Sequence, residues 1–125
     1  ERRIMNLPIV SFEVAKDLKE LGFAWADNRF YDTWGKHHHY LILRNYDPCW
    51  DYPAPTQSEV CKWLRDERGY HIMISFCDGL WKADIIDIRI YEDEIIADTK
   101  LQESFEQAEL EGIKKAIEIL KEYES

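Results

Sequence analysis

The order of local signals in the second half of the chain, residues 55–124, constrains the fold most strongly. Thr56-Gln57-Ser58-Glu59 and Ser104-Phe105-Glu106-Gln107 both have the spacing of a capping box, which predicts two helix N-termini. Between the two predicted helices, Asp78-Gly79 separates two alternating segments and predicts a two-residue hairpin turn. This half of the chain therefore reads as a helix, three strands and a helix.

The three strands are predicted from the alternation of apolar and polar side chains. One strand covers Tyr70 to Cys77, a second runs from Leu80 to about Tyr91, and a third covers Glu94 to Thr99. The apolar positions of the second strand change parity between Ile85 and Ile86. We therefore expect a β-bulge near these two residues.

Small residues recur along one edge of the last predicted helix. Ala108, Gly112 and Ala116 follow each other at four-residue spacing, so they lie on the same side of the helix. An edge without large side chains lets a helix lie close to a sheet or to another helix. We interpret this pattern as a feature of helix packing and not as part of a functional site.

The sequence of the first half of the chain predicts one helix and two strands. Ser11 is a candidate N-cap, and Gly22 ends the helical pattern. The two strands are expected at Phe23 to Tyr31 and His38 to Tyr46. Residues 47–55 contain three prolines and are predicted to be an extended linker.

These elements give an α+β fold in the order α-β-β-α-β-β-β-α, with an antiparallel sheet and helices packed on one of its faces. The length of 125 residues fits a single domain, residues 1–125. Within it we distinguish a helix with a hairpin (1–46), a proline-rich and aromatic linker (47–55) and an α-β-β-β-α unit (56–124).

Charge and cysteine content narrow the classes of function. The net charge is −9, and residues 55–125 carry nine Lys or Arg against seventeen Asp or Glu. Such an acidic surface repels phosphate groups, so it argues against binding to nucleic acid or to an anionic membrane. Three cysteines without a Cys-x-x-Cys pair indicate a reducing compartment, and we expect a cytoplasmic protein. No apolar run approaches the roughly 20 residues that span a bilayer, and Glu1 to Met5 does not resemble a signal peptide.

The element order of residues 55–124 resembles the double-stranded-RNA-binding domain. The resemblance implies RNA contacts by a basic start of the last helix and by a histidine in the loop between the first two strands. In this chain the last helix begins with Glu103-Ser104-Phe105-Glu106, and the loop is only Asp78-Gly79. The resemblance therefore extends to topology and not to RNA recognition.

The whole chain also resembles a group of small, acidic, aromatic-rich proteins of bacterial mobile elements and prophages. Pro53-Ala54-Pro55-Thr56 leading into Lys62-Trp63-Leu64-Arg65 carries this resemblance, as does Ser104 to Ala108 leading into Ile113-Lys114-Lys115-Ala116. The group implies a phage-type accessory protein and brings no activity with it.

No pattern in the sequence predicts a catalytic residue, a metal site or a cofactor. His37-His38-His39 would alternate across a strand, so at most two of these side chains could share an ion. None of Cys49, Cys61 and Cys77 lies in a setting that predicts a reactive thiolate. The nearest candidate for acid–base chemistry is an acidic hairpin with Asp84, Asp87 and Glu94.

The strongest candidate site is aromatic and consists of Trp34, Tyr46, Trp50 and Tyr52. Tyr and Trp are enriched in interface hot spots, because they bury a large area and keep a polar group. Alternatively, these rings fold back as a lid that anchors the linker to the core. The sequence leaves both interpretations open.

We therefore expect a non-catalytic binding module whose partner is another protein or a second copy of the chain. One alternative is an acidic mimic of nucleic acid, in which the Asp and Glu side chains of residues 84–111 occupy a basic site. A second alternative is an enzyme that uses the acidic hairpin.

Overall fold

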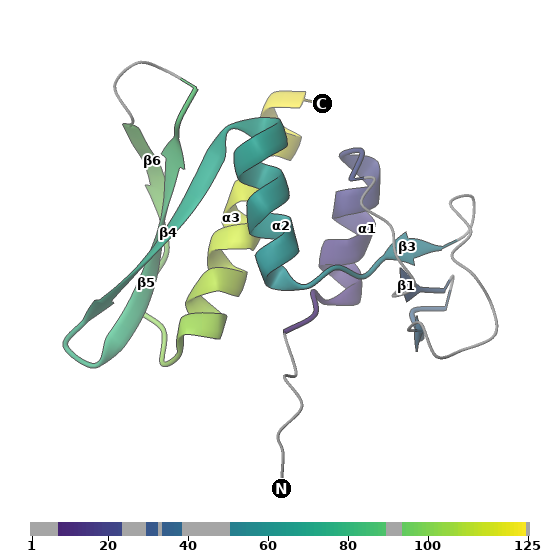
Figure 1. Ribbon diagram of the computed structural model, residues 1–125, viewed down its shortest axis with the longest axis horizontal. Helices are drawn as coiled ribbons and strands as arrows, with labels where there is room; N and C mark the ends of the chain where they lie inside the picture. The colour runs from purple at the N-terminus through teal and green to yellow at the C-terminus, as the bar shows by residue number, and fades with distance from the viewer. Residues whose placement is uncertain (1–7, 24–29, 33, 39–50, 90–93, 125) are drawn as a thin grey trace, which may run out of the picture.

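A computed structural model describes residues 8–23, 30–32, 34–38, 51–89 and 94–124. The first half contains helix α1 (Phe12–Glu20) and the short strands β1 (Phe30–Tyr31), β2 (His37–His38) and β3 (Tyr52–Pro53). The second half contains helix α2 (Gln57–Trp63), the π-helical turn η1 (Leu64–Arg68), strands β4 (Tyr70–Cys77), β5 (Leu80–Asp87) and β6 (Glu94–Asp98), and helix α3 (Phe105–Glu124). The α+β class is confirmed, and the element order fits the prediction (Figure 1).

The described strands form two antiparallel sheets, whereas the sequence suggested one. The large sheet has the order β4-β5-β6, and the small sheet has the order β2-β1-β3. Strand β3 lies within the segment predicted as a linker, and its Pro53 pairs opposite Phe30. Proline has no backbone N–H to donate to a neighbouring strand. It is tolerated here because β3 is an edge strand of the small sheet. The remainder of the predicted strand pair in residues 24–29 and 39–46 lies outside the described residues.

The predicted helix ends are confirmed by their hydrogen bonds. The Ser11 side chain accepts a hydrogen bond from the Val14 N–H, and Thr56 forms a reciprocal capping box with Glu59. The Ser104 hydroxyl accepts a hydrogen bond from the Gln107 N–H at 3.0 Å. Each cap satisfies N–H groups that lack a partner within the first turn of a helix.

The hairpin between β4 and β5 has the predicted two-residue turn. Asp78 and Gly79 both have positive φ, at 52° and 83°, as a type I′ turn requires. The predicted irregularity at Ile85/Ile86 is also present, in the pairing of β5 with β6. Ile85 pairs with Ala97 and Ile86 with Ile95, so the extra residue is Ile96 of β6. The bulge therefore lies on the neighbouring strand and not on β5 itself.

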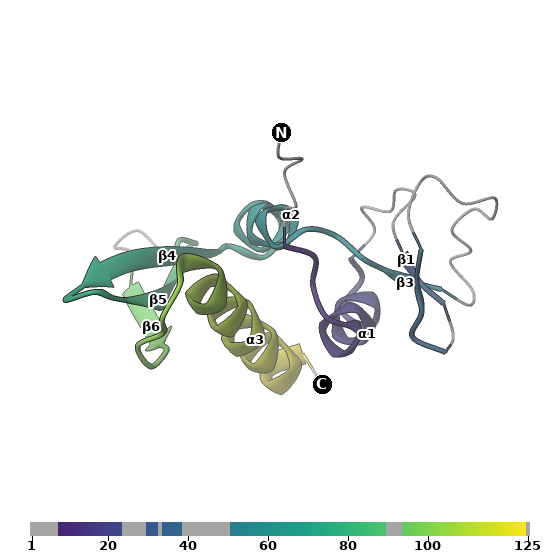
Figure 2. The same ribbon diagram turned by 90° about the horizontal axis from the view of Figure 1, so that it is seen from below.

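Helix α3 covers one face of the large sheet, and its small residues make the close approach (Figure 2). Ala108, Gly112 and Ala116 are all buried. A Cβ atom at Gly112 would lie 2.8 Å from Cγ2 of Ile72 and 2.9 Å from Cβ of Ala83. The prediction of a tightly packed small edge is therefore confirmed, and the sheet is its partner.

The hydrophobic core is shared by both halves of the chain. Val14 and Leu18 of α1 belong to the same buried cluster as Val60 of α2 and Ile113 and Ile117 of α3. In Figure 1 the large sheet and the small sheet lie at opposite ends of the molecule, with helices α1, α2 and α3 between them. Among the described residues, no helix has the length and apolar character needed to span a membrane.

Candidate functional site

Three aromatic rings meet at the hairpin end of the large sheet. Phe76 of β4 and Trp81 of β5 are direct cross-strand partners, and their ring centroids are 4.7 Å apart. Phe105, the first residue of α3, also contacts Trp81, edge-on and with a centroid distance of 5.6 Å. We call Phe76, Trp81 and Phe105 the hairpin cluster.

The hairpin cluster is exposed although it is apolar. Phe76 is 60% exposed and Phe105 is 40% exposed, and nearby in the chain Leu101 is 50% exposed. Trp81 is half-buried between the two phenylalanines. Aromatic side chains of this size normally gain more stability by burial than by exposure, so a contiguous exposed group of them marks a contact surface.

The backbone around the hairpin cluster is firmly held. Trp81 and Gln102 exchange two backbone hydrogen bonds, of 2.8 Å and 2.6 Å, which tie the segment before α3 to strand β5. The Ser104 cap then fixes the start of α3. The three rings therefore project from a preorganised platform, which lowers the entropy lost when a partner binds.

Acidic residues flank the members of the hairpin cluster along the chain. Asp78 lies in the adjacent turn, and Glu103 and Glu106 lie beside Phe105 in the chain; all three are exposed. An apolar centre with a charged rim is the usual arrangement of a protein–protein interface.

Two of the four residues in the predicted aromatic patch are described, and they lie in different environments. Trp34 is 88% exposed in the turn between β1 and β2. The Asp32 carboxylate holds this turn by accepting hydrogen bonds from the N–H groups of Trp34 and Lys36. Tyr46 and Trp50 lie outside the described residues.

Tyr52 packs against α1. Its ring contacts Phe12 edge-on at 5.3 Å, and the Lys19 ammonium lies 4.7 Å from the centre of the ring. The same lysine donates a hydrogen bond to the Asp51 carbonyl at 2.8 Å. For Tyr52 this packing supports the interpretation as a lid, and the described part of the patch contains only Trp34 as a fully exposed ring.

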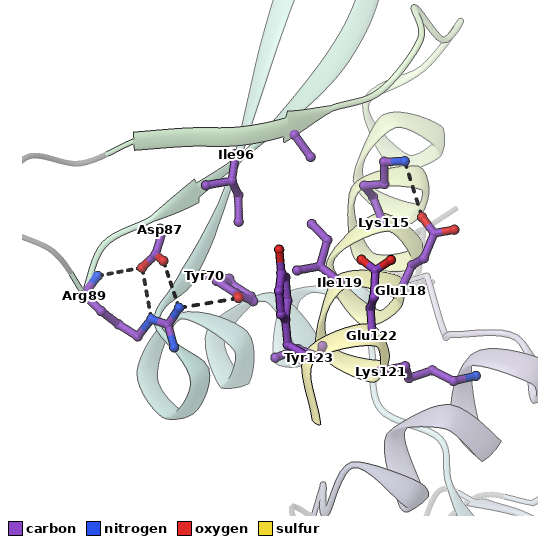
Figure 3. A pocket seen from close by; sticks show the side chains of 12 residues that line it. Tyr70, Asp87, Arg89, Ile96, Lys115, Glu118, Ile119, Lys121, Glu122 and Tyr123 are labelled. Carbon is purple, nitrogen blue, oxygen red and sulfur yellow. Dashed lines mark hydrogen bonds and ion pairs between the residues drawn. The ribbon is translucent and has the colours of Figure 1, made fainter. Parts of the chain in front are cut away.

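A second candidate site is an open hollow of about 1130 Å³ at the end of the large sheet opposite the hairpin cluster (Figure 3). Ile119 and Tyr123 of α3 face Ile96 of β6 and Tyr70 of β4 across it. Tyr123 is 77% exposed. The hollow is wide and lined by both charged and apolar side chains, so it lacks the enclosed shape of a small-molecule site.

Arg89 and Asp87, which line this hollow, are paired with each other. The Arg89 guanidinium donates to both carboxylate oxygens of Asp87, at 3.0 Å and 2.8 Å, and lies 5.0 Å from the Tyr70 ring. These hydrogen bonds hold the pKa of Asp87 below its usual range. Asp87 is therefore ionised at neutral pH, which is unsuitable for a general acid.

The three carboxylates proposed for acid–base chemistry do not line one described hollow. Asp87 lines the hollow of Figure 3, whereas Asp84 is 8% exposed and lies 3.6 Å from the Lys82 ammonium. Glu94 is exposed at the start of β6. The described residues contain no group of three or more His, Cys, Asp or Glu side chains that could hold a metal ion.

Cys61 and Glu109 form a contact between α2 and α3. The thiol donates to Oε2 of Glu109 over 3.6 Å, and the glutamate is 9% exposed. Burial and the neighbouring carboxylate raise the pKa of the Cys61 thiol far above its usual value, and burial also raises the pKa of Glu109. A thiol that resists ionisation is a weak nucleophile. Cys77 is exposed, and Cys49 lies outside the described residues.

The acidic surface of residues 84–111 is interrupted. Asp84 and Glu109 are buried, and Lys82 lies 3.6 Å from both Asp84 and Asp98. Lys100 adds a positive charge within the segment. The described surface is therefore a mixture of charges and not a continuous acidic strip.

Sequence reasoning did not single out the hairpin cluster. Phe76 and Trp81 share the apolar phase of the buried residues of β4 and β5, and phase alone places them on the covered face of the sheet. They lie at the hairpin end of the two strands, where Phe76 is 60% exposed. The Asp78-Gly79 turn, separated from Phe76 only by Cys77, is the sequence signal that Phe76 and Trp81 lie near the tip of the hairpin.

Comparisons of the chain with protein-family models, with curated proteins and with solved structures found no match.

Proposed function

We propose that this chain is a non-catalytic protein-binding module, of the accessory type found on bacterial mobile elements, that works in the cytoplasm. Its binding surface is the hairpin cluster together with Leu101. The observation that carries the proposal is the exposure of 60% at Phe76 and 40% at Phe105 around a half-buried tryptophan. A central aromatic group on a rigid platform is the usual composition of an interface hot spot.

The alternatives have less support. Catalysis by the acidic hairpin would need all three carboxylates to converge on one site. Asp87 and Glu94 are cross-strand partners, but Asp84 is buried beside Lys82 and the Asp87 carboxylate is bound by Arg89. Mimicry of nucleic acid would need a continuous acidic surface, and lysines interrupt it. RNA binding would need basic contacts at the start of α3, where Glu103 and Glu106 lie instead.

The test is a selection of peptides from a random library on the immobilised full chain, followed by affinity measurements on the selected peptides. We expect apolar peptides that lose at least about tenfold in affinity when Phe76→Ser and Phe105→Ser are combined, because removal of hot-spot aromatics costs about 2 kcal/mol or more. Trp34→Ser is the control, since it removes an exposed ring from the turn between β1 and β2, which belong to the small sheet.

Circular dichroism must show that each variant retains its fold. The proposal fails if the library yields no binder. It also fails if the affinity of the binders falls with Trp34→Ser and is unchanged in the Phe76/Phe105 double variant.

A further inference from the structure

Strand β4 has an open edge whose backbone groups point away from the sheet. The Gly69 carbonyl accepts a hydrogen bond from the Ile88 N–H at 2.9 Å, so the odd-numbered residues of this segment bond to β5. Because ladder bonds alternate along an antiparallel pair, the backbone groups of Tyr70, Ile72, Ile74 and Phe76 point to the other side. Among the described strands, none pairs with β4 on that side.

The β4 edge lacks the features that usually prevent strands from pairing. Tyr70–Cys77 is eight residues long and contains no proline, lysine, arginine, aspartate or glutamate. The opposite edge, β6, begins with Glu94 and ends with Asp98. Proteins commonly protect an exposed edge with charges or proline, so the unprotected edge is the one expected to accept another strand.

We propose that the strand accepted at this edge is β4 of a second copy of the chain, paired antiparallel about a twofold axis at Met73. This register places Ile72 beside Ile74 of the second copy, and Tyr70 beside Phe76 of the second copy. All four outward-pointing residues are then hydrogen-bonded, and each pair joins side chains of the same kind. Cross-strand pairs of aromatic or β-branched residues stabilise a sheet.

Charges at the two ends of β4 support the same arrangement. Arg68 directly precedes the strand; its guanidinium also donates to the Leu21 carbonyl and lies over the Trp63 ring. Asp78 directly follows the strand and is exposed. In the proposed register Asp78 of one copy lies opposite Arg68 of the other, at both ends of the interface. Complementary charges of this kind fix the register of an interface.

The inference deepens the proposed function by naming the partner, and it rests on the hairpin cluster being a binding surface. Phe76 belongs both to the hairpin cluster and to the β4 edge. In the proposed dimer Phe76, which is 60% exposed, is the register partner of Tyr70 of the second copy. The two large sheets become one six-stranded sheet.

The test compares Met73→Lys with Met73→Gln in the full chain by sedimentation equilibrium. Met73 is 39% exposed and lies opposite Asp84 of β5, so a lysine there is compatible with the monomer. In the dimer the two lysines would lie directly opposite each other. We expect dimers of the unmodified chain and of Met73→Gln, and an association constant at least about tenfold lower for Met73→Lys.

A cysteine at the same position tests the register. In a Cys49→Ser/Cys77→Ser background, Met73→Cys should form a disulfide-linked dimer on mild oxidation. Residues that face each other in a non-hydrogen-bonded antiparallel pair have Cα atoms about 4.5 Å apart, which a disulfide can bridge. Glu94→Cys on the opposite edge is the control and should remain monomeric.

The inference is overturned if the unmodified chain stays monomeric at every concentration, if Met73→Lys associates as well as Met73→Gln, or if Met73→Cys does not cross-link. These outcomes are separable from failure of the proposed function. A monomeric chain whose selected peptides still depend on Phe76 and Phe105 retains its binding surface and loses only the second copy as its partner.

Discussion

Replacement of Gly112 by alanine tests the close contact between α3 and the large sheet. The added Cβ would lie 2.8 Å from Cγ2 of Ile72 and 2.9 Å from Cβ of Ala83. Carbon atoms in favourable contact are about 3.5–4.0 Å apart, so each contact must lengthen by roughly 0.6–1.2 Å. Ile72 can move its side chain, whereas the Ala83 methyl group is attached directly to the backbone of β5. The helix or the strand must therefore shift.

Two opposing effects set the change in the free energy of unfolding caused by Gly112→Ala. An overpacked core costs about 1–3 kcal/mol, whereas replacing glycine by alanine inside a helix stabilises it by about 1 kcal/mol. We expect the balance for Gly112→Ala to be a loss of up to about 2 kcal/mol in the free energy of unfolding. Gly112→Val should lose more, because it adds two further methyl groups to the same contact.

Urea denaturation followed by tryptophan fluorescence measures this free energy. The control is the pair Lys114→Ala and Lys114→Gly, at an exposed position of the same helix. Both variants lose the lysine, so the difference between their free energies of unfolding reports helix propensity alone. We expect this difference to be about 1 kcal/mol in favour of alanine. If Gly112→Ala stabilises the protein by the full propensity difference, the close approach at Gly112 is refuted.

Three further predictions concern the packing of α2. Thr56→Ala should lower the free energy of unfolding in urea by about 1 kcal/mol through loss of the capping box, and no loss would contradict the role of the cap. Burial raises the pKa of Glu109 in the folded state, so stability falls as pH rises from the usual range of a glutamate through this raised value. Glu109→Gln should therefore stabilise the protein at pH 7 and not at pH 3, and a gain of equal size at both pH values would contradict this. Cys61, whose pKa is raised, should alkylate more slowly at pH 8 than the exposed Cys77 in peptide mass mapping, and equal rates would show that the thiol is accessible.

Local signals predicted the elements of the second half, because the structure there depends on nearby residues. Thr56 and Ser104 cap the helices that follow them, and Asp78-Gly79 supplies the two positive φ angles of its turn. The parity change at Ile85 indicated the right place for a bulge. It could not identify the bulged strand, because that depends on which strand pairs with β5.

The division into two sheets and the position of the hairpin cluster depend on distant contacts. The pairing of Tyr52 with Tyr31 joins residues 21 positions apart, and alternation alone does not say which strands meet. Similarly, Phe76 and Ile72 have the same phase in β4, yet Ile72 lies under α3 and Phe76 lies at the tip. Phase predicts the face of a side chain and not how far the covering helix extends.

Amide hydrogen exchange along β4 tests the central claim most directly. The claim is that the even-numbered residues of this strand form a binding edge for a second copy. We predict that the amides of Ile72, Ile74 and Phe76 become protected as the protein concentration rises, while those of Met73 and Ser75 are protected by β5 at every concentration. Rapid, concentration-independent exchange at Ile72, Ile74 and Phe76 would contradict the account.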